Sequence, residues 1–152
     1  LIMCISNNFI GNTFNSNIRR KDTSLMEIGS SPSLMPELSL LENIKYFLFN
    51  DNINENMMSN VLNKYELESF KNDLVGDFSS GMVKRSEIAI ADLKNPKVLC
   101  IDEPRVYLDE NGVELLLNLI TKREKEGSTS ILSSQESIGA FTSIERSFNL
   151  ND

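Results

Sequence analysis

Two adjacent carboxylates, Asp102 and Glu103, end a short apolar run in the stretch NPKVLCIDEP, and a third acid, Asp109, follows a few residues later. One carboxylate at such a position can hold Mg²⁺, which binds few protein carboxylates directly and prefers substrate phosphates. The neighbouring carboxylate can orient or deprotonate an attacking water. The pattern therefore suits phosphoryl transfer to water, although strands often end in acids at a sheet edge without any such role.

A second group that could do chemistry is the small-residue stretch Ser79, Ser80 and Gly81, which precedes the helical pattern VKRSEIAIADL. The free N–H groups and positive dipole end of a helix N-terminus form an anion site, and Ser79 could add a hydroxyl. Taken alone, the stretch is better explained as a simple N-terminal cap.

The two acids close an apolar segment, KVLCID, bounded by Pro96 and Pro104, which predicts a buried β-strand. Ligands of open α/β sheets bind beyond the carboxyl ends of strands. Asp102 and Glu103 are therefore expected at the ligand-binding edge of the sheet. Cys100, inside the same segment, is expected to be a small core residue.

The elements around this strand alternate as helix, strand, helix and strand. The second helix is expected to end in KREKEG, with cations near its C-terminus and Gly127 as the stop. Short strands are expected over residues 128–134 and 144–150. This alternation predicts parallel strands joined by helical crossovers, an α/β sheet flanked by helices. The apolar faces of the two helices are Met82, Ala89, Ile90 and Leu93 in the first and Val113, Leu116, Leu117 and Ile120 in the second.

The first half of the chain is expected to contain short strands and turns to residue 31, including a strand over 23–29. A Ser- and Pro-rich loop follows, and Ser39 with Glu42 three residues later fits a capping box that starts a helix. A second helix is expected over 57–67 and an irregular stretch over 68–81. Residues 39–80 therefore form a predicted helical subdomain of one domain, 1–152, whose α/β portion is 1–38 and 81–152.

Composition restricts the classes of partner. The 152 residues suit one domain, and a net charge of −7 argues against binding nucleic acid or anionic lipid through bulk electrostatics. There is no histidine and there are two cysteines, so Cys/His zinc sites are excluded and a reducing compartment is expected. No apolar stretch reaches the roughly 20 residues needed to span a bilayer, so no direct membrane insertion is expected.

Together, these motifs resemble the ATP-binding cassette (ABC) ATPases. FSSGM, residues 78–82, stands for the signature, Arg85 lies in the following helix, NPKVLCIDEP matches the Walker B strand, and YLD, residues 107–109, matches the D-loop. All occur at the family's spacing without a gap. TSILSSQE looks like the strand that carries the family's switch histidine, with Gln135 in its place. The resemblance covers nearly the whole chain and implies a partial P-loop NTPase fold with a helical subdomain.

The resemblance also implies roles, with ATP and Mg²⁺ as cofactors. Two such domains pair head to tail, and each ATP lies between one Walker A loop and the partner's signature. Glu103 would be the catalytic base, Asp102 the Mg²⁺ partner and Gln135 the switch residue. The implied nucleotide contacts are Ser79, Ser80, Gly81 and Asp109.

One subfamily fits best, the ATP-binding subunit of the cytochrome c maturation (heme exporter, CcmA-type) transporters. Its pattern after the Walker A helix resembles EIGSSPSLMPELSLLENIKYF, with matches at Gly29, Leu34, Glu37, Leu38, Glu42, Asn43 and Ile44. General ABC proteins share part of this pattern. Membership implies a peripheral position on an inner membrane, at the bacterial cytoplasmic face or the mitochondrial matrix face, reached by binding integral membrane subunits.

The chain also departs from the family. No G-x-x-x-x-G-K-[ST] motif occurs, and the resemblance places the first residue just past the Walker A loop, in the helix that follows it. Without that phosphate cradle, these residues are expected to bind ATP weakly or not at all, and to act as an ATPase only when completed upstream. Substituted positions are Ser30 in the Q-loop, Ser80 and Met82 in the signature, Arg105 and Val106 after Walker B, and Gln135 at the switch.

Three functions are weighed. The first is the ATP-hydrolysing subunit of a membrane transporter, in which the helical block 39–80 docks on membrane subunits, with Phe47, Phe49 and Phe70 as possible contacts beside their alternative core roles. The second is a non-catalytic partner or remnant. The third, an ABC-type ATPase of DNA repair or ribosome function, is disfavoured by the acidic balance and the lack of a basic stretch or coiled-coil insertion.

Overall fold

The computed structural model describes residues 2–6, 24–29, 31–134 and 146–149. The described chain divides into two compact units. One contains residues 1–30, 96–104 and 117–152, and the other contains residues 31–95 and 105–116. Each unit is described by itself below.

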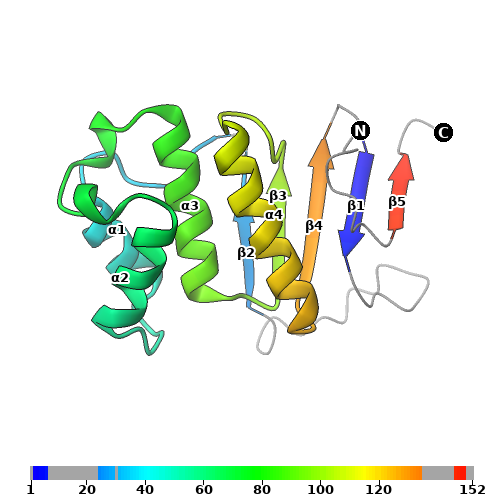
Figure 1. Cartoon of the computed structure of the whole chain (residues 1–152), viewed down its shortest axis with the longest axis horizontal. Helices are drawn as coiled ribbons and strands as arrows, with labels where there is room; N and C mark the ends of the chain where they lie inside the picture. Colours follow the sequence, from blue (N-terminus) through cyan, green and yellow to red (C-terminus); the bar gives the residue numbers. More distant parts are fainter. Residues whose placement is uncertain (1, 7–23, 30, 135–145, 150–152) are drawn as a thin grey trace. The chain divides into compact units, whose positions relative to one another are not determined.

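The first unit contains a five-stranded sheet in the order β2-β3-β4-β1-β5 (Figure 1). Its strands are β1 (Ile2–Ser6), β2 (Leu25–Ile28), β3 (Val98–Asp102), β4 (Thr129–Ser134) and β5 (Arg146–Asn149). Strands β2, β3 and β4 are parallel, as predicted. The α/β fold class predicted from the sequence is thereby confirmed.

The sheet is not parallel throughout, which corrects the sequence prediction. Strand β1 runs antiparallel to both β4 and β5. Apolar periodicity could not reveal this, because side chains alternate with the same period of two whichever way a strand runs. The helix that the family resemblance implied at the start of the chain is also wrong over Ile2–Ser6, which is a strand containing two β-branched isoleucines.

Strand β3 alternates between buried and half-buried side chains. Leu99 and Ile101 are buried, whereas Cys100 is only half-buried and lies opposite Glu27 of β2 in the parallel register. Cys100 is therefore less enclosed than the predicted core residue. Burial and, secondarily, the Glu27 carboxylate raise the pKa of the Cys100 thiol, which keeps it protonated and weakly reactive near neutral pH.

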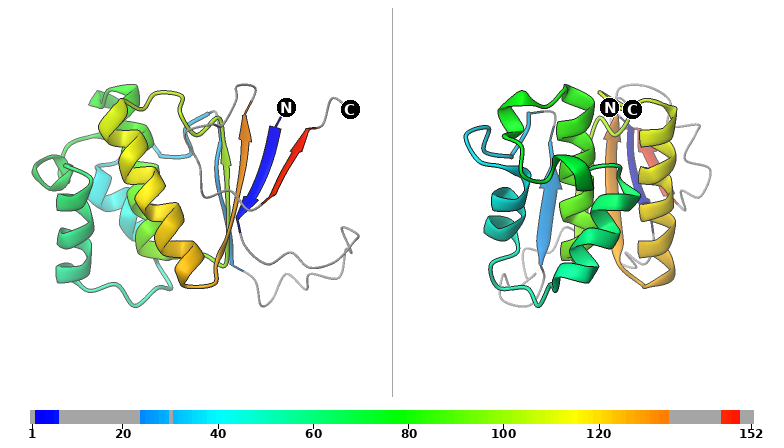
Figure 2. Two further views of the ribbon diagram at one scale, coloured as in Figure 1. Left: turned by 45° about the vertical axis from the view of Figure 1, so that its right-hand side comes forward. Right: turned by 60° about the vertical axis from the view of Figure 1, so that its left-hand side comes forward.

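The second unit is helical and contains α1 (Leu40–Phe47), α2 (Glu55–Lys64), α3 (Ser80–Lys94) and the start of α4 (Glu110–Lys125). Figure 2 shows these helices from two further directions. Short 3₁₀ turns at Glu68–Phe70 and Val75–Asp77 fill the stretch predicted to be irregular. The remainder of α4, residues 117–125, belongs to the first unit.

The predicted capping box at the start of α1 is confirmed. The Glu42 backbone N–H donates to Ser39 Oγ at 3.2 Å, and the Ser39 backbone N–H donates to a Glu42 carboxylate oxygen at 2.8 Å. The Ser39 hydroxyl also donates to this carboxylate oxygen at 2.7 Å, and this hydrogen bond, followed by the one from the Ser39 backbone N–H, lowers the pKa of Glu42. The box fixes where the helical unit begins its first helix.

More of helix α3 is buried than the single apolar face that the sequence predicts. Every residue from 86 to 93 is buried, including polar ones. Glu87 accepts hydrogen bonds from both the backbone N–H and the hydroxyl of Ser33, at 2.7 and 2.9 Å. Asp92 pairs with Lys64 at 2.8 Å and accepts from the Tyr65 hydroxyl at 3.2 Å. Buried acids with partners, rather than apolar side chains alone, thus anchor α3.

The packing of α3 groups it with the helical unit. It contacts both α1 and α2, and the compact unit that contains residues 31–95 includes all three helices. None of the described helices is long and apolar enough to cross a bilayer.

Candidate functional site

The paired acids lie where the sequence placed them, at the carboxyl end of β3. Asp102 is the last residue of the strand and pairs with Ser133 of β4 in the parallel register. Glu103 follows with a φ of 47°, a left-handed conformation that is uncommon for a residue with a side chain. Its backbone N–H donates to the Ser133 carbonyl at 2.8 Å, so the turn after β3 is tied to β4.

Each acid also accepts a hydrogen bond from a serine of β4. The Ser133 hydroxyl donates to Asp102 Oδ1 at 2.7 Å, and the Ser134 hydroxyl donates to Glu103 Oε2 at 2.9 Å. Charge-assisted hydrogen bonds of this kind hold a carboxylate in one orientation. Neither serine was predicted to belong to the site, although both stand at the end of the strand predicted over residues 128–134.

The donor set at this edge fits Mg²⁺ held mainly through phosphate. Among the described residues, no cluster of three or more metal-ligating side chains occurs. Mg²⁺ typically keeps several waters and binds through one or two carboxylates together with substrate phosphates. Asp102 is the residue that would hold the ion here, beside the carboxylate of Glu103.

The signature stretch forms the N-terminus of α3. Ser79 is the N-cap, and its hydroxyl accepts from the Met82 backbone N–H at 3.2 Å. Helix α3 begins at Ser80, so Gly81 lies within its first turn rather than before it, which corrects the predicted start. A Cβ at Gly81 would approach the Tyr107 carbonyl oxygen to 3.1 Å, so a larger residue there requires the backbone at Tyr107 to shift slightly.

Asp109 caps α4. Its Oδ1 accepts from the Gly112 N–H at 2.8 Å and its carbonyl accepts from the Val113 N–H at 2.9 Å. The side chain is exposed. Its capping role is compatible with the predicted nucleotide contact, which stays a prediction. Gln135 and Ser30 lie outside the described residues.

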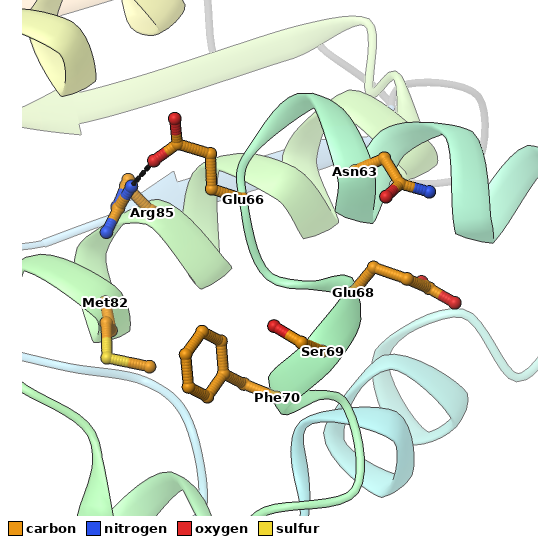
Figure 3. Close-up of a pocket in the computed structure, with 7 residues that line it drawn as sticks. All are labelled: Asn63, Glu66, Glu68, Ser69, Phe70, Met82 and Arg85. Carbon is orange, nitrogen blue, oxygen red and sulfur yellow. Dashed lines mark hydrogen bonds and ion pairs between the residues drawn. The ribbon is translucent and has the colours of Figure 1, made fainter.

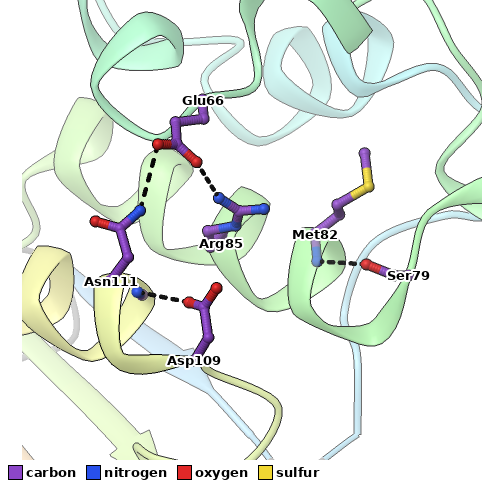
Figure 4. A network of polar contacts seen from close by, with 7 residues as sticks. Glu66, Ser79, Met82, Arg85, Asp109 and Asn111 are labelled. Atoms are coloured by element: carbon purple, nitrogen blue, oxygen red, sulfur yellow. Dashed lines mark hydrogen bonds and ion pairs between the residues drawn. The ribbon is translucent and has the colours of Figure 1, made fainter.

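A polar network that sequence analysis missed joins α3 to the start of α4 (Figure 4). One oxygen of Glu66 pairs with Arg85 at 2.8 Å, and the other accepts from the Asn111 amide at 3.3 Å. Glu66 follows α2 and has a φ of 59°. No sequence signal marks this residue, because glycine or asparagine is the usual indicator of a left-handed position.

Substitution can separate the strain of the left-handed backbone at Glu66 from the contribution of its ion pair with Arg85. Left-handed backbone costs a non-glycine residue roughly 1–2 kcal/mol, whereas an exposed ion pair contributes about 0.2–1 kcal/mol. Glu66→Gly is therefore expected to be at least as stable as the original protein, and Glu66→Ala less stable than both. Thermal unfolding of the three proteins measures the order. A Glu66→Gly variant less stable than Glu66→Ala would contradict the assignment of backbone strain.

A surface pocket lies beside this network in the helical unit (Figure 3). Its volume is about 610 Å³. Phe70 and Met82 provide its apolar part, and Arg85, already paired with Glu66, lies at one side. The remaining lining residues are Asn63, Glu66, Glu68 and Ser69. The Met82 position, where the family signature has Gln, therefore contributes an apolar surface next to the α3 N-terminus.

Comparison with known proteins defines the class. Residues 7–106 match the protein family described as ABC transporter, and the chain belongs to this family. It is 33% identical over 126 residues to the lantibiotic transport ATP-binding protein SrtF of Streptococcus pyogenes, a match that covers 83% of this chain and 54% of SrtF. It is 29% identical over 126 residues to the cytochrome c biogenesis ATP-binding export protein CcmA of Histophilus somni, covering 82% and 58%.

Solved structures have the same fold. An ATP-binding subunit of an ABC transporter matches with a TM-score of 0.71 at 22% identity, covering 84% of this chain and 60% of that one. The ATP-binding cassette MJ0796, solved as a dimer bound to ADP and Pi, matches with a TM-score of 0.67 at 24% identity, covering 84% and 63%. The chain spans about half the length of the curated relatives it matches.

Proposed function

We propose that this chain is part of the ATP-binding and ATP-hydrolysing subunit of an ABC transporter. The observation that carries the proposal is the pair of acids at the end of β3, each oriented by a serine of β4. Asp102 would hold the Mg²⁺ ion that accompanies ATP, and Glu103 would orient and deprotonate the attacking water. When bound, ATP would supply the phosphoryl group, and the Mg²⁺ held by Asp102 would offset its negative charge.

The signature residues would act on a second copy. Ser79, Ser80 and Gly81 form the N-terminus of a long helix, which favours contact with a phosphate. Asp109 would contact the nucleotide from the adjoining YLD segment. In this proposal two domains pair head to tail; the MJ0796 cassette, which has the same fold, was solved as a dimer bound to ADP and Pi. The switch position would be held by Gln135.

The helical unit would dock on integral membrane subunits and so hold the protein at an inner membrane. Phe49, in the turn just after α1, is 84% exposed, and Tyr46 near the end of α1 is 65% exposed. Large exposed aromatic side chains of this kind are enriched at protein interfaces. Phe70 is 40% exposed but contributes to the pocket, and Phe47 is half-buried, so Phe49 and Tyr46 are the stronger contacts.

For the cargo, we propose a role in cytochrome c biogenesis or heme export. The relatives named CcmA, from Histophilus somni and Shewanella oneidensis, support it at 29% and 28% identity. Relatives named for lantibiotic and L-arabinose transport have 33% and 37% identity and favour other cargo. Complementation of a strain lacking its cytochrome c maturation ATPase separates these: restored cytochrome c supports the proposal, and none restored contradicts it.

Nucleotide binding by the full-length protein tests the proposed class. Calorimetric titration with ATP and Mg²⁺ is expected to show saturable binding, and Asp102→Asn is expected to weaken the Mg²⁺-dependent part, because it removes the carboxylate charge. Omitting Mg²⁺ from the unsubstituted protein is the matched control. Absence of any nucleotide uptake by the full-length protein would contradict the proposal.

The alternative is a non-catalytic ABC domain that acts as a partner or remnant. The substituted positions Ser30 in the Q-loop, Met82 in the signature and Gln135 at the switch favour it. Such a protein would bind a complete cassette through its signature face without hydrolysing ATP itself. Association with a catalytically complete cassette, combined with no ATP uptake by the full-length protein, is the result expected for this alternative.

A further inference from the structure

The Ser134 hydroxyl contacts the carboxylate to which the proposed function assigns proton transfer. It donates to Glu103 Oε2 at 2.9 Å, across adjacent strands and 31 positions apart in the sequence. Ser134 is the last residue of β4 and only 6% exposed. A buried hydroxyl at the end of a strand is held by the sheet, so it defines a fixed point for the carboxylate it contacts.

The backbone of Glu103 is already fixed by other contacts. Its N–H donates to the Ser133 carbonyl, and its φ of 47° restricts the direction in which the side chain leaves the backbone. The side chain of a glutamate has several rotatable bonds, so the backbone alone does not set the direction of its carboxylate. A charge-assisted hydrogen bond to one carboxylate oxygen restricts this rotation and sets where the other oxygen points.

We propose that Ser134 is a positioning residue for Glu103, which rests on the proposed ATPase function. Ser134 does not touch the reacting atoms. It holds the Glu103 carboxylate in the orientation that meets the attacking water. The Ser133 hydroxyl donates to Asp102 Oδ1 at 2.7 Å and orients this carboxylate in the same way. Two adjacent serines would therefore orient the metal-binding acid and the base separately.

Ser134→Ala in the full-length protein tests this role. The variant removes the hydroxyl and leaves the strand intact, so kcat for ATP is expected to fall about 10- to 100-fold, the size of effect that a misplaced catalytic group produces. KM for ATP, calorimetric ATP affinity and the unfolding temperature are expected to stay unchanged. Ser134→Thr keeps a hydroxyl at this position and is expected to recover most of kcat.

Ser128→Ala is the matched control, because Ser128 is also buried and directly precedes β4. It is expected to leave kcat unchanged. Two outcomes would overturn the proposal: Ser134→Ala retaining full kcat, or losing kcat together with unfolding temperature and without rescue by threonine. Glu103→Gln separates this failure from that of the proposed function. If Glu103→Gln loses turnover and Ser134→Ala does not, only the positioning role is overturned.

Discussion

Glu103→Gln is expected to lower ATP turnover by the full-length protein about 100- to 10,000-fold, the range that general-base catalysis contributes. Glutamine has nearly the same shape, and its side-chain oxygen can accept the Ser134 hydrogen bond that the carboxylate accepts. It cannot accept a proton from the attacking water. ATP binding is therefore expected to persist while phosphate release slows by that factor. Calorimetry measures the binding, and a steady-state phosphate assay measures the release.

Glu114→Gln provides the matched control for this substitution. Glu114 is an exposed acid on α4 and belongs to the helical unit. Losing its charge is expected to leave turnover unchanged, which separates the chemistry at Glu103 from a general effect of one fewer carboxylate. Unchanged turnover in Glu103→Gln would remove Glu103 as the catalytic base.

Arg123→Met is expected to lower the free energy of unfolding by about 3–5 kcal/mol. Arg123 is fully buried, and its guanidinium donates to the carbonyl oxygens of Pro96 at 2.8 Å and Thr129 at 3.0 Å, and to Ser130 Oγ at 3.1 Å. Methionine fills much of the volume but leaves these buried acceptors without that donor. Chemical denaturation of the two proteins measures the difference.

Lys125→Met is the control, since Lys125 is an exposed cation in the same last turn of α4. It is expected to change stability by no more than about 0.5 kcal/mol, as surface substitutions usually do. Arg123→Lys is expected to fall between, because an ammonium keeps the charge but cannot reproduce the planar fork. If Arg123→Met were as stable as Lys125→Met, the buried hydrogen bonds would carry little stability.

Arg123 also shows which structural features a local sequence pattern can predict and which it cannot. The sequence predicts cations in the last turn of this helix, where they favour the dipole, and cations do occur there. The sequence of the helix does not determine which of these cations faces solvent and which is buried. The structure brings the chain before β3 and the start of β4 to the end of α4, and Arg123 bridges the two strands through Pro96 and Thr129.

The same distinction applies to the site. The positions of Asp102, Glu103 and the Ser79 cap followed from the sequence, because an apolar run, its flanking prolines and a helix cap are set by neighbours in the chain. The serine partners of the acids did not, since strands 31 positions apart meet only when the sheet forms.

What the sequence determined by itself was therefore local: the capping box at Ser39, the strand that ends in two acids, and the amphipathic period of α4. Each of these features depends on residues that are close to one another in the sequence. Tertiary structure alone decided the reversed direction of β1 and the burial of Arg123. These depend on contacts between segments distant in the chain, and neither periodicity nor propensity carries information about which distant segments meet.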